Sequence, residues 1–136
     1  MAHISEVSVS NDHWDQIDAG LIGVGVYSDK TFSPIGSQID TKYNGIFTEA
    51  IKVGDVKGEK GESHLFYSGG KRFLLLGLGD KNKYEADDVR NAAGKASRIA
   101  IEKRVSHLVL DCLSRDHCQS IGEGLVLGSY KFSDYE

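Results

Sequence analysis

The sequence predicts an α/β domain in which helices cover both faces of a mixed, mostly parallel β-sheet. Two short and nearly continuous apolar runs, 19–27 and 73–78, are typical of strands that are covered on both faces. Strands and helices alternate from residue 72 onward, which implies right-handed crossovers and parallel pairing. The 136 residues suffice for one domain with a sizeable core. We therefore expect a single three-layer α/β/α domain over residues 1–136.

The amino-terminal part predicts two strands of different kinds. Residues 4–9 alternate apolar and polar side chains, as in a half-buried edge strand. Trp14 follows in a polar connection, where it either anchors an interface or packs over a sheet edge. Residues 19–27 then form the first fully covered strand. The loop 31–38 after it carries the only proline, Pro34.

A helix is expected after this loop, because five apolar residues recur at helical spacing: Tyr43, Ile46, Phe47, Ala50 and Ile51. Asp40 or Thr41 is the candidate cap, and Gly54 is the expected terminator. Gly45 lies inside the pattern and costs helix stability.

The middle of the chain predicts a turn region and a hairpin. Residues 56–63 hold Gly58, Gly61 and several charges, which is typical of turns. Strands over 63–67 and 72–78 flank Ser68-Gly69-Gly70-Lys71, whose glycines supply the positive φ of tight hairpins. The segment 73–78 is the most apolar run and should be a central strand.

The carboxy-terminal part predicts a helix, a strand and a second helix. The first helix covers about 84–104 and has a face of small and apolar residues: Val89, Ala92, Ala93, Ala96, Ile99 and Ala100. Residues 107–111 form a buried strand. A last helix, capped by Ser114, is expected because one stripe has helical spacing: Cys118, Ile121, Leu125, Gly128 and Phe132.

Composition narrows the class of function. The net charge of −4 argues against non-specific nucleic-acid binding, although the local patches Lys71-Arg72 and Lys95/Arg98 are basic. Hydrophobic residues make up 40% and charged residues 26% of the chain, as in ordinary globular domains. No run approaches the length of a membrane span, and the amino terminus does not look like a signal peptide. We expect a cytoplasmic protein with no membrane partner.

One glycine motif has two interpretations. Gly77 and Gly79 follow a strand and precede a helix, so with Asp80 and Lys81 they are candidate ligand-binding residues for a nucleotide or ADP-ribose. Asn82 stands where the dinucleotide fingerprint has its third glycine, and no P-loop lysine pattern is present. A tight strand-to-helix turn is the favoured interpretation.

Other chemistry-bearing residues predict no catalytic or metal site. The group Cys112, His117 and Cys118 is at most a partial zinc site, and incidental packing explains it better. The carboxylate pairs Asp87-Asp88 and Glu59/Glu62 lie in polar surroundings and are expected to be solvated. No local signature of a Ser/His/Asp or Cys/His arrangement is visible.

Five segments resemble, in the same order, the amino-terminal domain of the leucyl aminopeptidase family: Leu21–Tyr27, Gly58–Glu62, Arg72–Lys81, Val89–Arg98 and Glu123–Phe132. The resemblance implies a fold similar to the macro domain, which elsewhere binds ADP-ribose. It also implies that the parent protein is a cytosolic metallo-aminopeptidase that removes amino-terminal residues, leucine among them, from peptides.

In that family the catalytic residues and two divalent metals, zinc or manganese, belong to a carboxy-terminal domain. The resemblance therefore assigns no catalytic or metal-binding residue and no cofactor to this chain. It implies two kinds of partner, the chain's own catalytic domain and further subunits of a hexamer that carries this domain on its outside. The last segment looks like the start of a connection to a following domain, and we expect the chain alone to be inactive.

Overall fold

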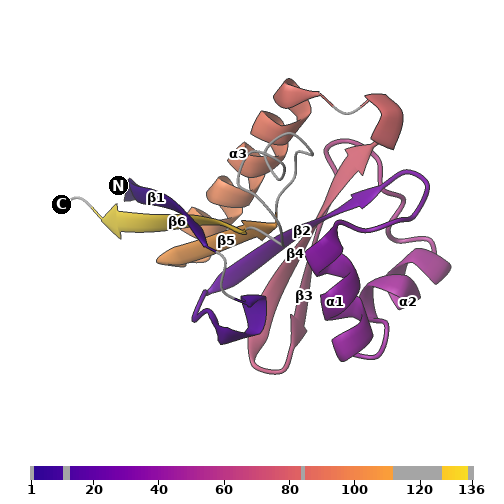
Figure 1. Ribbon diagram of the computed structural model, residues 1–136, viewed down its shortest axis with the longest axis horizontal. Helices are drawn as coiled ribbons and strands as arrows, with labels where there is room; N and C mark the ends of the chain where they lie inside the picture. Colours follow the sequence, from indigo (N-terminus) through magenta and orange to yellow (C-terminus); the bar gives the residue numbers. More distant parts are fainter. Residues whose placement is uncertain (1, 11–12, 84, 112–126, 135–136) are drawn as a thin grey trace.

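The computed structural model describes residues 2–10, 13–83, 85–111 and 127–134 of the chain. Its described strands form one sheet in the order β1-β6-β5-β2-β4-β3 (Figure 1). The strands are β1 (Ala2–Ser10), β2 (Leu21–Tyr27), β3 (Ser63–Ser68), β4 (Lys71–Gly79), β5 (His107–Asp111) and β6 (Leu127–Asp134). The helices are α1 (Pro34–Lys42), α2 (Ile46–Lys52) and α3 (Ala86–Glu102), with short 3₁₀ turns over Trp14–Gln16 and Lys81–Lys83.

The sheet is mixed, as predicted, but it is not mostly parallel. β2 pairs in parallel with β4 and with β5. The pairs β1–β6, β5–β6 and β3–β4 are antiparallel, so three of the five pairings between described strands are antiparallel. The prediction was wrong on this point because β6 lies between β1 and β5, where the sequence pattern placed no strand.

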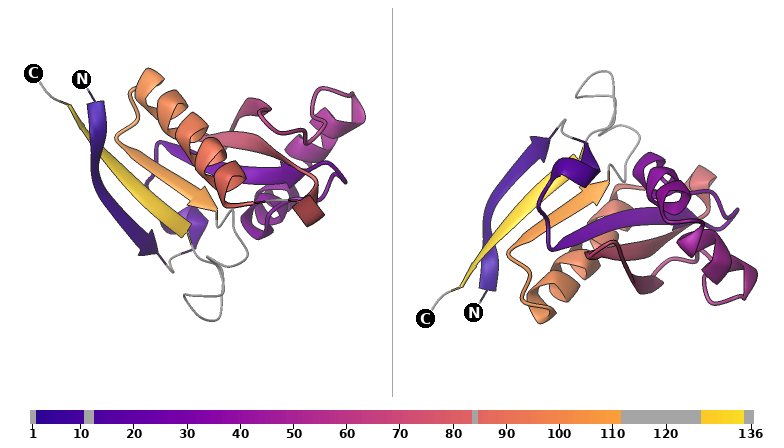
Figure 2. Two further views of the ribbon diagram at one scale, coloured as in Figure 1. Left: turned by 90° about the horizontal axis from the view of Figure 1, so that it is seen from above. Right: turned by 90° about the horizontal axis from the view of Figure 1, so that it is seen from below.

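The helices cover both faces of the sheet (Figure 2). One core lies under α1 and α2 and includes Ile39, Phe47, Phe73 and Leu75. The other lies under α3 and is built mainly from leucines and alanines: Leu21, Leu74, Leu76, Leu78, Ala92, Ala96, Ala100, Leu108 and Leu110. Successive residues of β4 enter opposite cores, since side chains alternate across a strand. This double coverage explains the continuous apolar run of the strand and confirms the layered arrangement.

The helical region after β2 differs from the prediction. Pro34 begins α1 instead of lying in a loop, because its fixed φ suits the first helical turn. Asn44 and Gly45 have φ values of 60° and 79°, which end α1 and separate it from α2. The predicted helix therefore corresponds to α2, which begins at Ile46, and α1 occupies part of the segment 31–38 that was expected to be a loop.

Asp40 is a helix cap, as the sequence predicted, but it caps α2 from its position within α1. Its carboxylate accepts hydrogen bonds from Phe47 N at 2.8 Å and from Thr48 N at 3.0 Å. The first amides of a helix have no partner within the helix, and these two find theirs on Asp40. The side chain of Asp40 is buried, so it ties the two helices together.

The predicted last helix is wrong where the structure describes it. Gly128 and Phe132 lie in β6, which pairs with β1 on one side and with β5 on the other. Ladder hydrogen bonds to both neighbours satisfy the backbone there, so the helical spacing of the apolar residues does not decide the structure. The remainder of that helix and the group Cys112, His117 and Cys118 lie outside the described residues.

The predicted hairpin is confirmed. Gly69 and Gly70 have φ values of 59° and 75° in the two-residue turn of the β3–β4 hairpin. Trp14 is only 1% exposed, and its indole N–H donates to Gln38 Oε1 at 3.0 Å. It packs edge-on against Phe73, so it is a core residue and not an exposed interface anchor. No helix in the described ranges is both long and apolar enough to cross a membrane.

Candidate functional site

The candidate site is a cleft between α3 and the loop 56–62, which passes across the carboxyl end of β4. Gly77 and Gly79 of this strand make the close approach of the loop possible. A Cβ at Gly77 would lie 1.9 Å from the carbonyl oxygen of Glu59. The loop instead pairs with the strand, because Gly77 N donates to Glu62 O at 2.9 Å and Gly79 N donates to Gly58 O at 2.8 Å.

Glu62 organises this loop through its carboxylate. The carboxylate accepts hydrogen bonds from Lys57 N at 2.8 Å and from Glu59 N at 2.5 Å, and it contacts His64 Nε2 at 2.9 Å. Burial acts to raise the pKa of Glu62, but these hydrogen bonds outweigh it and hold the pKa below its usual value. Glu62 is thus a structural carboxylate, and the expectation that it is simply solvated was wrong.

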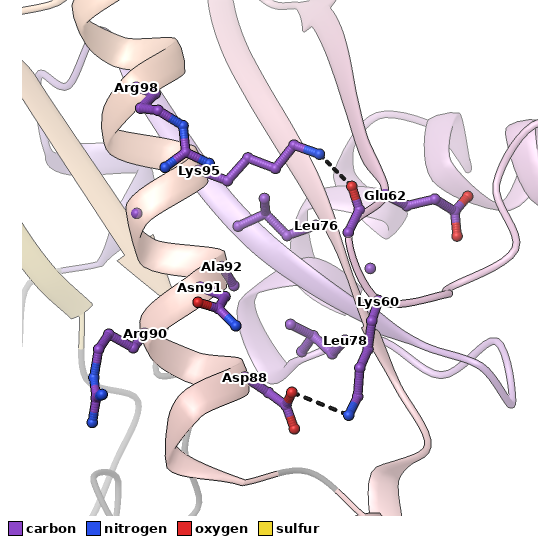
Figure 3. A pocket seen from close by; sticks show the side chains of 13 residues that line it. Lys60, Glu62, Leu76, Leu78, Asp88, Arg90, Asn91, Ala92, Lys95 and Arg98 are labelled. Carbon is purple, nitrogen blue, oxygen red and sulfur yellow. Dashed lines mark hydrogen bonds and ion pairs between the residues drawn. The ribbon is translucent and has the colours of Figure 1, made fainter.

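Two contacts join the loop to α3, as Figure 3 shows. Lys60 Nζ lies 3.1 Å from Asp88 Oδ1, and Lys95 Nζ donates to the carbonyl oxygen of Gly61. Asp88 also accepts a hydrogen bond from Glu85 N at 2.9 Å at the start of the helix. This bond, together with the contact from Lys60, lowers the pKa of the Asp88 carboxyl. Asp88 therefore connects the helix start and the loop and is not merely solvated, contrary to the prediction.

The cleft between these contacts has a volume of about 480 Å³. Its floor is apolar and includes Leu76 and Leu78 of β4, and its rim includes Lys95 and Arg98 of α3. Figure 3 shows Arg90 pointing away from the loop. Among the described residues that line the cleft, none is a serine, threonine, cysteine, tyrosine or histidine. Such a lining suits binding of a polar or charged group, because lysine, arginine and carboxylate side chains surround the cleft.

The four predicted ligand-binding residues each make contacts of their own in the structure. The amides of Gly77 and Gly79 are engaged by the loop, as described above. Asp80 Oδ1 accepts from Asn82 N at 2.8 Å, which closes the turn after β4. Lys81 Nζ lies 3.8 Å from Asp29 Oδ2 and 5.0 Å from the centre of the Tyr27 ring. Ligand binding at this turn stays a prediction, while the tight-turn interpretation accounts for the observed contacts.

Sequence reasoning missed the roles of Lys60 and Glu62. The glycines and charges of the segment 56–63 predict a turn region, and the pair Glu59/Glu62 was expected to be solvated. The segment Gly58–Glu62, which contains Lys60 and Glu62, is one of the five segments of the family resemblance, and that was the available signal. The basic pair Lys95/Arg98 was noticed, and both residues line the cleft.

Metal ligands do not assemble in the part of the chain that the structure describes. Within those residues, no three His, Cys, Asp or Glu side chains are placed to hold a metal ion. The divalent metals that the resemblance implies therefore have no matching ligand set among these residues, and no chemical step through a metal is assigned to them.

Comparisons with known proteins agree with the resemblance. A family model for the amino-terminal domain of the cytosol aminopeptidase family matches residues 24–136. The cytosol aminopeptidase of Dictyostelium discoideum is 32% identical over 118 residues, which are 80% of this chain and 22% of that protein. A protein of Alkaliphilus metalliredigens, named probable cytosol aminopeptidase, is 27% identical over 140 residues, which are 94% of this chain and 28% of that protein.

A solved structure shows the same fold. The structure of a mutant tomato leucine aminopeptidase superimposes with a TM-score of 0.63 at 21% sequence identity, over 79% of this chain and 24% of that one. The chain thus spans about a quarter of the length of these relatives. Because the family model covers most of the sequence, the chain belongs to the cytosol aminopeptidase family and corresponds to its amino-terminal domain.

Proposed function

We propose that residues 1–136 are the single, non-catalytic amino-terminal domain of a cytoplasmic, metal-dependent aminopeptidase. The parent enzyme removes amino-terminal residues, leucine among them, from peptides. The observation that carries this proposal is the match of the family's amino-terminal domain to residues 24–136. The reaction itself belongs to a carboxy-terminal domain with two divalent metals, zinc or manganese, which act by activating a water molecule.

The proposed role of this domain is structural and regulatory. Its partners are the catalytic domain of the same protein and further copies of the subunit in a hexamer, and it limits the access of peptides to the catalytic centre. The loop 56–62 supports such a role because it is held on two sides, by β4 through backbone hydrogen bonds and by α3 through Lys60 and Lys95. A surface fixed in this way is pre-organised for contact with another domain.

The first test is an activity assay on the purified chain. Leucine amide is the substrate, with zinc or manganese added, and metal-free chain is the control. We expect no metal-dependent release of leucine, because the reaction and its two metals are proposed to belong to the carboxy-terminal domain. Robust metal-dependent turnover by the chain alone would overturn the proposal.

The second test is to determine the transcript sequence beyond the codon for Glu136. We expect the reading frame to continue into a domain that contains a cluster of Lys, Asp and Glu residues suited to two metals. A stop codon directly after Glu136 would contradict the enzyme proposal. Titration of the chain with ADP-ribose, followed by calorimetry, would then test the nucleotide-binding alternative at Gly77–Lys81.

A further inference from the structure

β3 forms one edge of the sheet (Figure 1). The hydrogen-bonding groups of a strand alternate between its two sides. In a two-residue hairpin, the residues flanking the turn exchange hydrogen bonds, and here these are Ser68 and Lys71. Gly77 N also donates to Glu62 O. The backbone N–H and C=O groups of the even-numbered residues in this segment therefore point toward β4. The N–H and C=O groups of Ser63, Leu65 and Tyr67 therefore point away from the sheet.

This edge lacks the features that usually prevent strand addition. Its register with β4 runs from Ser63 to Ser68 without a bulge, and the strand contains no proline, lysine, aspartate or glutamate. Within the described residues, no backbone group of β3 bonds to a segment other than β4. Tyr67 is 65% exposed, and the other side chains of the strand are half-buried.

The opposite edge, β1, is protected. Its register with β6 shifts between Ile4 and Glu6, which places Ser5 in a bulge. Glu6 adds a charge to this edge and lies 3.9 Å from Lys131 of β6. Bulges and charges on an edge strand oppose pairing with another strand. The two edges of the sheet thus differ, because β1 is protected by a bulge and a charge and β3 has neither.

We propose that β3 pairs with β3 of a second copy of this chain, antiparallel, so that the two sheets become one. The outward groups fix the register, because an outward residue of one strand must face an outward residue of the other. The register that pairs all three outward residues, Ser63, Leu65 and Tyr67, places Leu65 opposite Leu65 of the second copy. Ser63 then faces Tyr67, and His64 faces Phe66.

The side chains are compatible with this register on both faces of the sheet. Leu65 packs with the core under α3, so the two Leu65 side chains meet on that face. Phe66 packs with the core under α1 and α2, and it meets His64 of the other copy there. No facing pair carries like charges, and apolar and aromatic cross-strand pairs stabilise sheets. A second copy fits this edge because the strand is complementary to itself, and the two-fold arrangement closes without forming fibres.

The association is expected to be weak, because five paired residues bury less surface than a stable protein interface. It should therefore appear as a monomer–dimer equilibrium between micromolar and millimolar concentrations of the chain. This pairing depends on the geometry of the sheet and its edges and is independent of the proposed function.

Hydrogen exchange of individual amides, followed by NMR at increasing chain concentration, tests the proposal directly. The amides of Leu65 and Tyr67 should exchange quickly at low concentration and slow about twofold when half of the chains are dimeric. The amides of Phe66 and Ser68 should be protected throughout, because they bond to β4. Sedimentation equilibrium supplies the fraction of dimer at each concentration. Exchange at Leu65 and Tyr67 that is independent of concentration would overturn the proposal, whether the chain stays monomeric or associates through another surface.

A pair of matched variants gives a second readout. Tyr67→Pro removes an outward N–H and should abolish the dimer, since proline is tolerated on an edge strand where the N–H faces solvent. Ser5→Pro makes a similar change in the bulge of β1 and should leave the dimer unaffected. Circular dichroism establishes that both variants are folded. Equal dimerisation of the two folded variants would contradict pairing through β3.

Discussion

Replacement of Gly77 by alanine tests whether the loop 56–62 depends on close contact with β4. The added Cβ would lie 1.9 Å from Glu59 O and 2.8 Å from Glu62 Cβ, whereas carbon and oxygen atoms in contact are about 3.3 Å apart. The loop must therefore move by more than about 1 Å. The movement breaks the hydrogen bonds from Gly77 N to Glu62 O and from Gly79 N to Gly58 O.

The loss of stability in Gly77→Ala has two contributions, steric overlap and broken hydrogen bonds. Steric overpacking costs about 1–3 kcal/mol, and each lost backbone hydrogen bond costs about 1 kcal/mol. Because movement of the loop relieves part of the overlap, we expect Gly77→Ala to lower the free energy of unfolding by about 3 kcal/mol. For a domain of this size, that corresponds to a fall in Tm of about 10 °C.

Gly94→Ala is the matched control, because it makes the same chemical change within α3. The nearest atom to its added Cβ is Arg98 Nη1 at 3.6 Å, an ordinary contact. Alanine is favoured over glycine in a helix interior, so this variant should be more stable than the wild type by up to about 1 kcal/mol. Urea unfolding of both variants measures the difference. A loss below about 1 kcal/mol for Gly77→Ala would refute the argument that close contact holds the loop.

Three further predictions concern side chains. Asp40→Ala should lower the free energy of unfolding by about 2 kcal/mol in urea titrations, because Phe47 N loses its buried acceptor. Asp40→Asn should lower the free energy of unfolding by less than Asp40→Ala does, and an equal decrease for the two variants would contradict the capping role. The depressed pKa of Glu62 stabilises the fold above the usual pKa of 4.5, and this contribution is lost as the pH falls through the lowered pKa. Glu62→Gln should therefore weaken the pH dependence of stability below pH 4.5, and a pH profile identical to the wild type would exclude the effect. Lys60→Ala should change stability far less than Gly77→Ala, since Lys60 is largely exposed and its ion pair with Asp88 is screened. A comparable loss in the same titrations would mean that the ion pair, not the backbone contact, holds the loop.

The roles of the predicted carboxylate pairs show how burial changes the chemistry of a sequence motif. Glu62 and Asp88 were expected to be solvated, because their neighbours in the sequence are polar. In the structure, Glu62 accepts backbone hydrogen bonds within its own loop, whereas Asp88 meets Lys60 from a loop more than twenty residues earlier. Composition of the local segment cannot reveal such a partner, since it depends on where the loop lies against α3.

The sequence by itself determined the elements whose signal is local. The apolar runs of β2 and β4 predict fully covered strands, and Gly69-Gly70 predicts the hairpin. The periodic small residues of α3 predict a long helix. Each of these patterns is complete within a few residues or helical turns. The ordered segments also indicated the family, and the match over residues 24–136 confirmed it.

Only the tertiary structure decided the elements that depend on distant partners. The residues around Gly128 and Phe132 have helical spacing, yet they form β6 because β1 and β5, far away in the sequence, supply hydrogen bonds on both sides. The break at Gly45 likewise depends on Asp40, which caps α2 from the preceding helix. Strand order and loop contacts arise from pairing between residues that are distant in the sequence. The free energy of this pairing outweighs local propensity, and no periodic pattern in the sequence reveals it.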